Sequence, residues 1–190
     1  MVSTLVKFDR DNLDNRLLWS SDQGDLAERF GQLVQKCEMN SGHAPLVLVT
    51  TDVVDTHLIA AFNLATSFSR SCKTMLIDGT PKGQLVTGLL GLTSAGDSGL
   101  LFINRCLAVA ALREQQVFPE GWPNSVCGQV ADQMICFVTV RDAFQVDWLN
   151  LSKDVRVIAM AAPNELEEDR WSHLLAQVSA SRFLGLWVVD

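Results

Sequence analysis

Short, mostly apolar runs recur along the chain and alternate with segments of helical periodicity. The runs are residues 46–49, 73–78, 134–140, 155–161 and 183–189. A strand that is buried on both faces is continuously apolar, whereas a strand with one face in water alternates apolar and polar residues. The runs therefore predict an α/β fold, in which a mostly parallel β-sheet is flanked by helices on both faces.

Helices are predicted between these runs, where apolar residues recur every three or four positions. The first begins at Asp25, which forms a capping-box-like pair with Glu28. Its expected buried face is Leu26, Phe30, Leu33, Val34 and Cys37. Further helices are expected over residues 57–69, 84–91 and 99–115. A last helix is expected to be capped by Asn164 and Glu167 and to bury Trp171, Leu174, Leu175 and Val178.

The chain is long enough for one domain with a full hydrophobic core, since it has 190 residues. It contains no linker-like break and no internal repeat. We therefore expect residues 1–24 to form an irregular N-terminal segment and residues 25–190 to form a single α/β domain.

Composition argues against several classes of function. The net charge is −7 and the basic residues are scattered singly, so no nucleic-acid partner is expected. No apolar run reaches the roughly 18–20 residues of a membrane helix, and the first residues lack a signal-peptide core. We expect a cytoplasmic protein without direct membrane insertion. The cysteines form no CxxC pair and the histidines have no ligand spacing, so free thiols and no metal site are expected.

The order and spacing of the segments resemble a known family. The stretches "LVLVTT", "AAFNLATSFSRSCKTMLIDGTPKGQLVTGLLGL" and "DVRVIAMAAPNELEEDRWSHLLAQVSASRFLGLWVV" are similar to P-loop ATPases of the MinD/ParA (SIMIBI) type. They are most similar to the cytoplasmic domains of bacterial exopolysaccharide tyrosine kinases. The resemblance covers most of residues 25–190. It implies a P-loop NTPase-like fold whose nucleotide site follows the first strand.

The chain departs from this family at the phosphate-binding loop. His57 stands where the resemblance places the lysine that neutralises the phosphates, and Thr56 replaces the glycine before it. Leu58 replaces the Ser/Thr whose hydroxyl holds magnesium. Val53 is β-branched and resists the positive φ that loop glycines adopt. We therefore expect this loop not to grip a phosphate.

Charge in the loop points the same way. Asp52 occupies the position of the family's second, signature lysine, and Asp55 adds another carboxylate. A pair of unit charges about 4 Å apart interacts with roughly 4 kcal/mol at an effective dielectric near 20. The loop is expected to repel a triphosphate.

The other nucleotide motifs are also altered. Asp78 keeps the first carboxylate of the family's second strand, but Thr80 and Lys82 replace the next carboxylate and the arginine. Thr139 lies near the end of the third strand, where the family has a Walker B aspartate, and Asp142 is displaced from it. The family's base-contacting asparagine falls on Val189 or Asp190. We expect no catalytic residue and no nucleotide cofactor.

Alternatives remain for two of these residues. His57 is either a catalytic base or phosphate contact, or a polar residue on the first turn of a helix, which is favoured. Asp78 either holds magnesium or, as favoured, bonds to nearby backbone at the strand end. The chain contains no tyrosine, which excludes autophosphorylation on tyrosine. The kinases' oligomerisation motif E-x-x-R-x-x-R maps to Glu28, Gly31 and Val34, so only its glutamate is kept.

These features predict a pseudo-ATPase that works by binding protein. The resemblance implies an accessory or regulatory subunit of bacterial exopolysaccharide or cellulose synthesis and secretion. Its partner would be an envelope polysaccharide component or a related ATPase, in a homo- or heterodimer recruited to the inner membrane. The candidate interface comprises Asp52, Val53, Asp55, His57, Thr80, Lys82, Trp122 and Trp148. Two alternatives are a divergent ATPase that still binds nucleotide and a MinD/ParA-like spatial regulator of division, pilus or flagellar placement.

Overall fold

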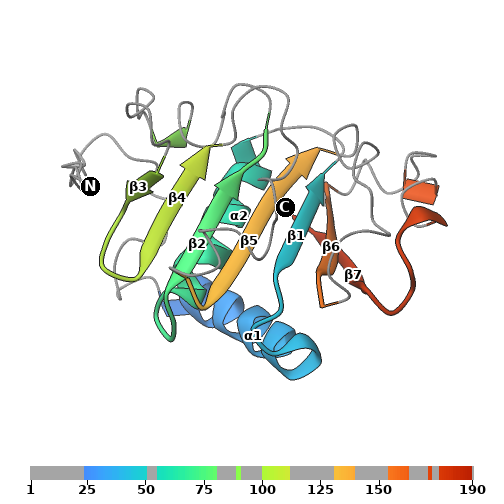
Figure 1. The fold of residues 1–190 in the computed structure, drawn as a ribbon, viewed down its shortest axis with the longest axis horizontal. Coiled ribbons are helices and arrows are strands. Elements are labelled where there is room, and N and C mark those ends of the chain that lie inside the picture. The colour runs from blue at the N-terminus through green and yellow to red at the C-terminus, as the bar shows by residue number, and fades with distance from the viewer. Residues whose placement is uncertain are drawn as a thin grey trace.

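A seven-stranded sheet organises the chain (Figure 1). The computed structural model describes residues 24–50, 55–80, 89–90, 100–111, 131–139, 154–162, 171–172 and 176–189. The helices are α1 (Gly24–Ser41) and α2 (Asp55–Phe68). The strands are β1 (Leu46–Thr50), β2 (Thr74–Asp78), β3 (Leu100–Phe102), β4 (Leu107–Ala111), β5 (Gln133–Thr139), β6 (Arg156–Ala161) and β7 (Phe183–Val188).

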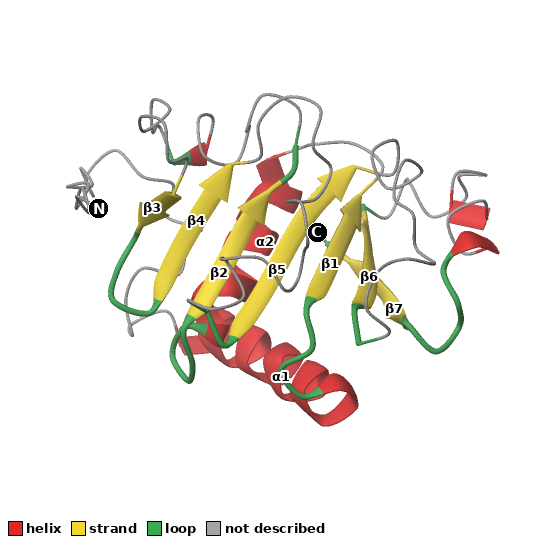
Figure 2. Cartoon of the chain, in the orientation of Figure 1, coloured by secondary structure: helices red, strands yellow, loops and turns green. Residues whose placement is uncertain are grey.

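The strand order places β1 near the middle of the sheet. The order is β3-β4-β2-β5-β1-β6-β7, and every neighbouring pair is parallel except β3 with β4. Figure 2 shows the parallel arrows pointing to one edge. The carboxyl ends of β1, β5 and β2 therefore lie side by side. The mostly parallel α/β sheet predicted from the apolar runs is confirmed.

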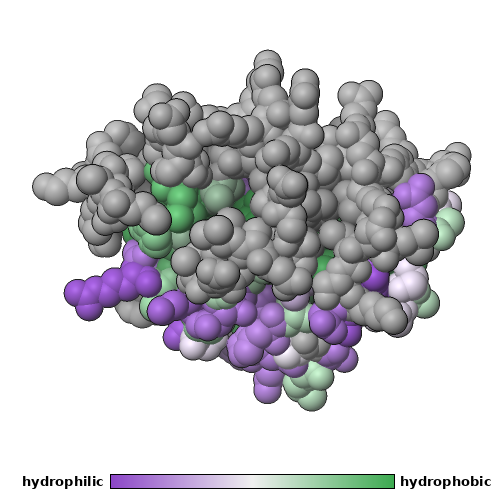
Figure 3. Space-filling view, viewed as in Figure 1, coloured by the Kyte–Doolittle hydropathy of each residue, from purple (hydrophilic) through white to green (hydrophobic). Residues whose placement is uncertain are grey.

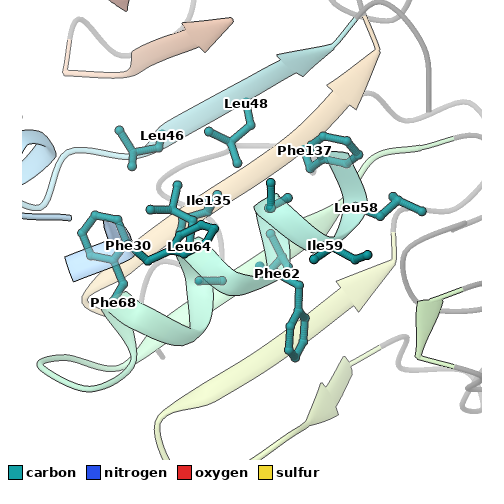
Figure 4. Packing of buried hydrophobic residues seen from close by; sticks show 14 of the residues in the cluster. Phe30, Leu46, Leu48, Leu58, Ile59, Phe62, Leu64, Phe68, Ile135 and Phe137 are labelled. Atoms are coloured by element: carbon teal, nitrogen blue, oxygen red, sulfur yellow. The ribbon is translucent and has the colours of Figure 1, made fainter. Parts of the chain in front are cut away.

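Helices α1 and α2 cover one face of the sheet. Helix α2 packs against β2 and β5, and α1 packs against α2. Phe62, Leu64 and Phe68 of α2 are fully buried in this layer, as Figure 4 shows. Phe30 of α1 meets Trp187 of β7 edge to face, with ring centroids 5.5 Å apart. Of the buried face predicted for α1, Phe30, Val34 and Cys37 are buried and Leu33 is half-buried, whereas the side chain of Leu26 lies outside the described part of the structure.

Helix α1 ends at Ser41, directly before a glycine. Gly42 adopts a φ of 58°, and its N–H donates to the Glu38 carbonyl at 2.8 Å. This left-handed residue satisfies a carbonyl of the last turn and ends the helix, a role that suits glycine because it lacks a Cβ. Hydrophilic residues gather over α1 on the surface shown in Figure 3.

The opposite face of the sheet is buried too. Its core includes Val47, Val49 and Cys136 from the strands, together with Trp171 and Val178. The backbone is helical at residues 171–172 and 176–177. Trp171 and Val178 are thus buried as predicted, whereas Leu174, Leu175, Asn164 and Glu167 lie outside the described residues.

The helix predicted over residues 99–115 is wrong. Residues 100–111 form the antiparallel hairpin of β3 and β4. The Asn104 side-chain oxygen accepts from the N–H groups of Cys106 and Leu107 at 2.7 and 2.8 Å, which closes the turn. The alanine-rich strand β4 then pairs in parallel with β2. Only residues 89–90 of the helix predicted over 84–91 are described.

The described cysteines are free thiols, as predicted. Cys37 and Cys136 are buried, Cys72 is half-buried and Cys106 is exposed. Burial raises the pKa of the Cys37 thiol to about 11, and the nearby Glu38 carboxylate adds to the shift. In the part of the chain that the structure describes, no group of acidic, histidine or cysteine side chains could hold a metal ion. None of the helices found there is long and apolar enough to cross a membrane.

We expect Phe62→Ala to lower the free energy of unfolding by about 3–5 kcal/mol, because the ring is fully buried and its removal leaves a cavity. Urea unfolding measures the change. Met39→Ala is the control, since Met39 is 80% exposed and its loss should change stability by less than about 0.5 kcal/mol. Equal costs for both variants would contradict the assigned core.

Stability should also depend on the Cys37 thiol at alkaline pH. Its pKa rises from 9.0 in the unfolded chain to about 11 in the fold, so folding favours the protonated form. This stabilisation is present below pH 9 and is lost as the pH rises through 11. Urea unfolding at several alkaline pH values should show a shallower loss of stability in Cys37→Ala than in wild type. Cys106→Ala, at an exposed thiol, should retain the wild-type slope.

Candidate functional site

The candidate site lies where the carboxyl ends of β1, β2 and β5 meet the start of α2. In open parallel sheets this edge is where ligands usually bind, because loops and helix N-termini converge there. Thr50 ends β1, Asp78 ends β2 and Thr139 ends β5. In the registers of the sheet, Thr50 lies beside Thr139 and Asp78 lies beside Phe137. The fold thus brings Asp78 and Thr139, which the sequence singled out, to the same edge of the sheet as the start of α2, which carries His57.

His57 is buried against the end of β1. Its side chain is fully buried, and Nδ1 lies 2.7 Å from the Thr50 hydroxyl, which is also fully buried. The prediction that His57 lies on the first turn of a helix is confirmed, since α2 begins at Asp55. The residue at the position of the family's phosphate-binding lysine therefore points into the protein and bonds to the strand.

The neighbours of His57 bring no cation to the site either. Leu58 is 4% exposed and belongs to the core under the helix, so its side chain points away from any ligand at the surface. Thr56 is half-buried, and Asp55 is exposed in the first turn. A carboxylate in that turn interacts favourably with the positive end of the helix dipole. Asp55 therefore occupies the position where a bound anion would gain most from α2.

Asp78 is bonded to the residue that replaces its partner carboxylate. The Asp78 Oδ1 accepts from the Thr80 backbone N–H at 3.0 Å and from the Thr80 hydroxyl at 2.6 Å. Both residues are buried, with Asp78 fully buried and Thr80 4% exposed. The favoured prediction for Asp78, a strand-end residue that bonds to nearby backbone, is confirmed.

Strand β5 contributes no carboxylate to the site. Its residues are Gln133–Thr139, and the terminal Thr139 is buried. Next to the site, Cys136 is fully buried between β1 and β2. Burial raises the pKa of the Cys136 thiol strongly, and the nearby Asp78 carboxylate raises it further. A thiol held protonated in this way is a poor nucleophile and a poor metal ligand.

Several predicted site residues lie outside the described residues. They are Asp52, Val53, Lys82, Trp122, Trp148, Asp142 and Asp190. Val189 is described: it is buried, and its N–H donates to the Ala161 carbonyl at 2.9 Å. A buried valine has no side-chain group that could bond to a base.

The pair of Thr50 and His57 was not predicted from the sequence. The available signal was a threonine at the end of a buried strand and a histidine seven residues later, at the start of a helix. Neither residue type at this spacing is specific for a contact. The pair becomes evident only when the strand end and the first helical turn are placed side by side.

Helix α1 carries the three positions onto which the resemblance maps the oligomerisation motif. Glu28 and Gly31 are exposed on α1, but Val34 is 7% exposed and lies in the core. The position of the motif's last arginine is therefore buried against α2 and the sheet. It has no access to a neighbouring molecule.

Comparisons with known proteins identify the fold. No protein-family model and no curated protein matches the sequence. Among solved structures, the crystal structure of the chimerical protein CapA2B2 matches with a TM-score of 0.62 and 12% identity. The match covers 89% of this chain and 86% of that chain. The predicted fold, a mostly parallel α/β sheet of the P-loop NTPase-like type, is confirmed by this match.

We expect Thr50→Val to lower the free energy of unfolding by about 1–3 kcal/mol, because it removes a hydroxyl bonded to a buried imidazole without changing the side-chain shape. Urea unfolding measures the cost. In a His57→Leu background the same substitution should cost less, since the imidazole is already absent. The two effects should therefore be coupled. Equal costs in both backgrounds would contradict a stabilising bond between the two side chains.

Proposed function

We propose, from the fold shared with CapA2B2 and from the altered site, that this chain is a catalytically inactive P-loop-fold protein. It acts by binding protein partners, as an accessory or regulatory subunit of a bacterial exopolysaccharide or cellulose synthesis and secretion system. It works in the cytoplasm and reaches the inner membrane through a partner. The partner is either an envelope polysaccharide component or a related ATPase.

The burial of His57 is the main support for the proposal that the chain is catalytically inactive. His57, at the position of the lysine that grips the phosphates, is fully buried and lies 2.7 Å from the Thr50 hydroxyl. To reach a phosphate outside the helix, the imidazole would have to leave this bond and its packing. A side chain that is already bonded inside the fold gains little by turning to a ligand.

The residues at the positions that would hold magnesium also argue against nucleotide binding. Leu58 has no oxygen to offer a metal, and Oδ1 of Asp78 accepts two hydrogen bonds from Thr80. Magnesium in nucleotide sites is held by a hydroxyl, a carboxylate and the phosphates together. Each of these contributions is missing or already used by the fold.

The proposed setting rests on the sequence resemblance to exopolysaccharide tyrosine kinases, and the fold shared with CapA2B2 supports it. A P-loop fold is used by proteins of many functions, so fold alone does not name the partner. The exposed Asp55, at the start of α2, is the described residue through which the site can present charge to a partner.

We expect no binding of ATP and magnesium in isothermal titration calorimetry, at concentrations up to the millimolar range, because the loop has no lysine, Leu58 stands at the position of the metal-binding hydroxyl, and a carboxylate stands at the helix start. A P-loop ATPase of this fold, titrated in parallel, is the positive control. Binding with a micromolar dissociation constant would refute the pseudo-ATPase and favour a divergent ATPase.

The setting is tested separately by affinity capture of the tagged chain from cells of its source organism, followed by mass spectrometry. Proteins of polysaccharide synthesis or export should be enriched over a capture with Asp55→Lys, which reverses the charge at the helix start. Enrichment of division, pilus or flagellar proteins instead would replace the proposed setting with that of a spatial regulator.

A further inference from the structure

Strand β7 forms one edge of the sheet, and among the described residues it pairs only with β6 (Figure 1). Edge strands of soluble proteins are usually kept from pairing by shortness, charged side chains or proline. The opposite edge, β3, has three residues. Strand β7 has six residues, "FLGLWV", with no charge and no proline. The two edges of the sheet are thus protected unequally.

A β-bulge shortens the regular part of β7. Val157 pairs with Phe183 while the next residue, Ile158, pairs with Gly185, so β7 holds one extra residue. Gly185 has a φ of 145°, which glycine tolerates better than other residues. From Gly185 to Val188 the register with β6 is regular. Only the stretch after the bulge is therefore straight enough to accept another strand.

The backbone groups of two residues point away from the sheet in this stretch. The Val189 N–H donates to the Ala161 carbonyl at 2.9 Å, so the backbone of residue 189 faces β6. In a parallel ladder successive residues direct their N–H and C=O groups to opposite sides. Trp187 therefore also faces β6, and the backbone groups of Leu186 and Val188 face outward.

The same two residues carry exposed apolar side chains. Leu186 is 46% and Val188 is 43% exposed. The intervening Trp187 turns to the other face and packs against Phe30. Leu186 and Val188 thus combine outward backbone groups with an apolar surface on one face of the sheet, which is the combination that strand pairing buries.

We propose that β7 pairs with β7 of a second copy of this chain, antiparallel, in the register that sets Trp187 against the partner's Trp187. Leu186 then lies opposite the partner's Val188, and the two exchange backbone hydrogen bonds. The two-fold symmetry repeats the same pair on the other side of the axis. The outward backbone N–H and C=O groups of Leu186 and Val188 in each copy then have hydrogen-bond partners, and each exposed leucine covers an exposed valine.

The geometry favours a second copy over an unrelated extended segment. A two-fold axis at Trp187 sets each outward residue of one copy opposite an outward residue of the other, so the edge supplies both sides of the contact. The strand carries no charge, so no like charges face each other across the axis although each copy has a net charge of −7. A register centred on Leu186 would instead set Val188 against the partner's Leu184, which lies at the bulge.

The contact is small, so the dimer is weak. An edge of this length buries less than the roughly 1,000 Å² typical of stable complexes. Association should therefore depend on concentration, and added salt should strengthen it by screening the repulsion between two acidic copies. The inference depends on the sheet edge and not on the state of the nucleotide site, so it can fail or succeed independently of the proposed function.

Sedimentation velocity of the full chain, from low micromolar to near-millimolar concentration, tests the proposal. Wild type should shift from monomer to dimer. Val188→Lys should raise the dissociation constant about tenfold or more, because it puts a cation into each apolar cross-strand pair. Phe102→Lys is the matched control, since Phe102 is 39% exposed on the opposite edge strand, and it should dimerise like wild type.

Two further measurements identify the edge. Val188→Pro removes an outward N–H without adding charge, a change that edge strands accept, and it should also weaken the dimer. In wild type, hydrogen exchange should slow with concentration at the amides of Leu186 and Val188 and stay unchanged at Trp187. The proposal is overturned if the chain remains monomeric at every concentration. It is also overturned if both Val188 variants dimerise as tightly as wild type, or if hydrogen exchange at these two amides does not change with concentration.

Discussion

Burial of the central strands on both faces is the constraint on which the rest of the structure depends. In β1, Leu46 and Leu48 face α2, and Val47 and Val49 face the opposite layer, while β5 and β6 occupy both edges of the strand. No side chain in the body of such a strand can meet a ligand. Chemistry is confined to the last residue of each strand and to the loops that follow. The fold therefore fixes where a site can lie before it determines what that site does.

At that edge the polar groups of this chain bond mainly to each other. Thr50 bonds to His57, and Asp78 bonds to Thr80. In a nucleotide site the corresponding groups must stay available for phosphate and metal, which leaves polar atoms poorly paired until the ligand binds. Here the same positions stabilise the protein without a ligand. Such internal bonding supports the proposal that this fold is retained without nucleotide binding.

The sequence predicted most strands of the sheet because two-sided burial leaves a continuous apolar run that few other structures share. It failed at residues 100–111, where "LAVAALR" reads as a helix by composition, since alanine favours helices and the run has no β-branched residue except Val109. The turn at Asn104 and the pairing of β4 with β2 decided the outcome. Tertiary pairing overrode local preference there.

For the candidate site, the sequence located the positions but not their partners. The resemblance marked His57, Leu58, Asp78 and Thr80, and the favoured prediction for Asp78 was correct because an aspartate at a strand end commonly bonds to the backbone two residues on. The burial of His57 could not be predicted, since it depends on how closely the first turn of α2 approaches the end of β1. The structure also changes what a partner protein can recognise: the buried His57 and Thr80 cannot form its contact surface, so recognition at this edge has to use exposed groups such as Asp55.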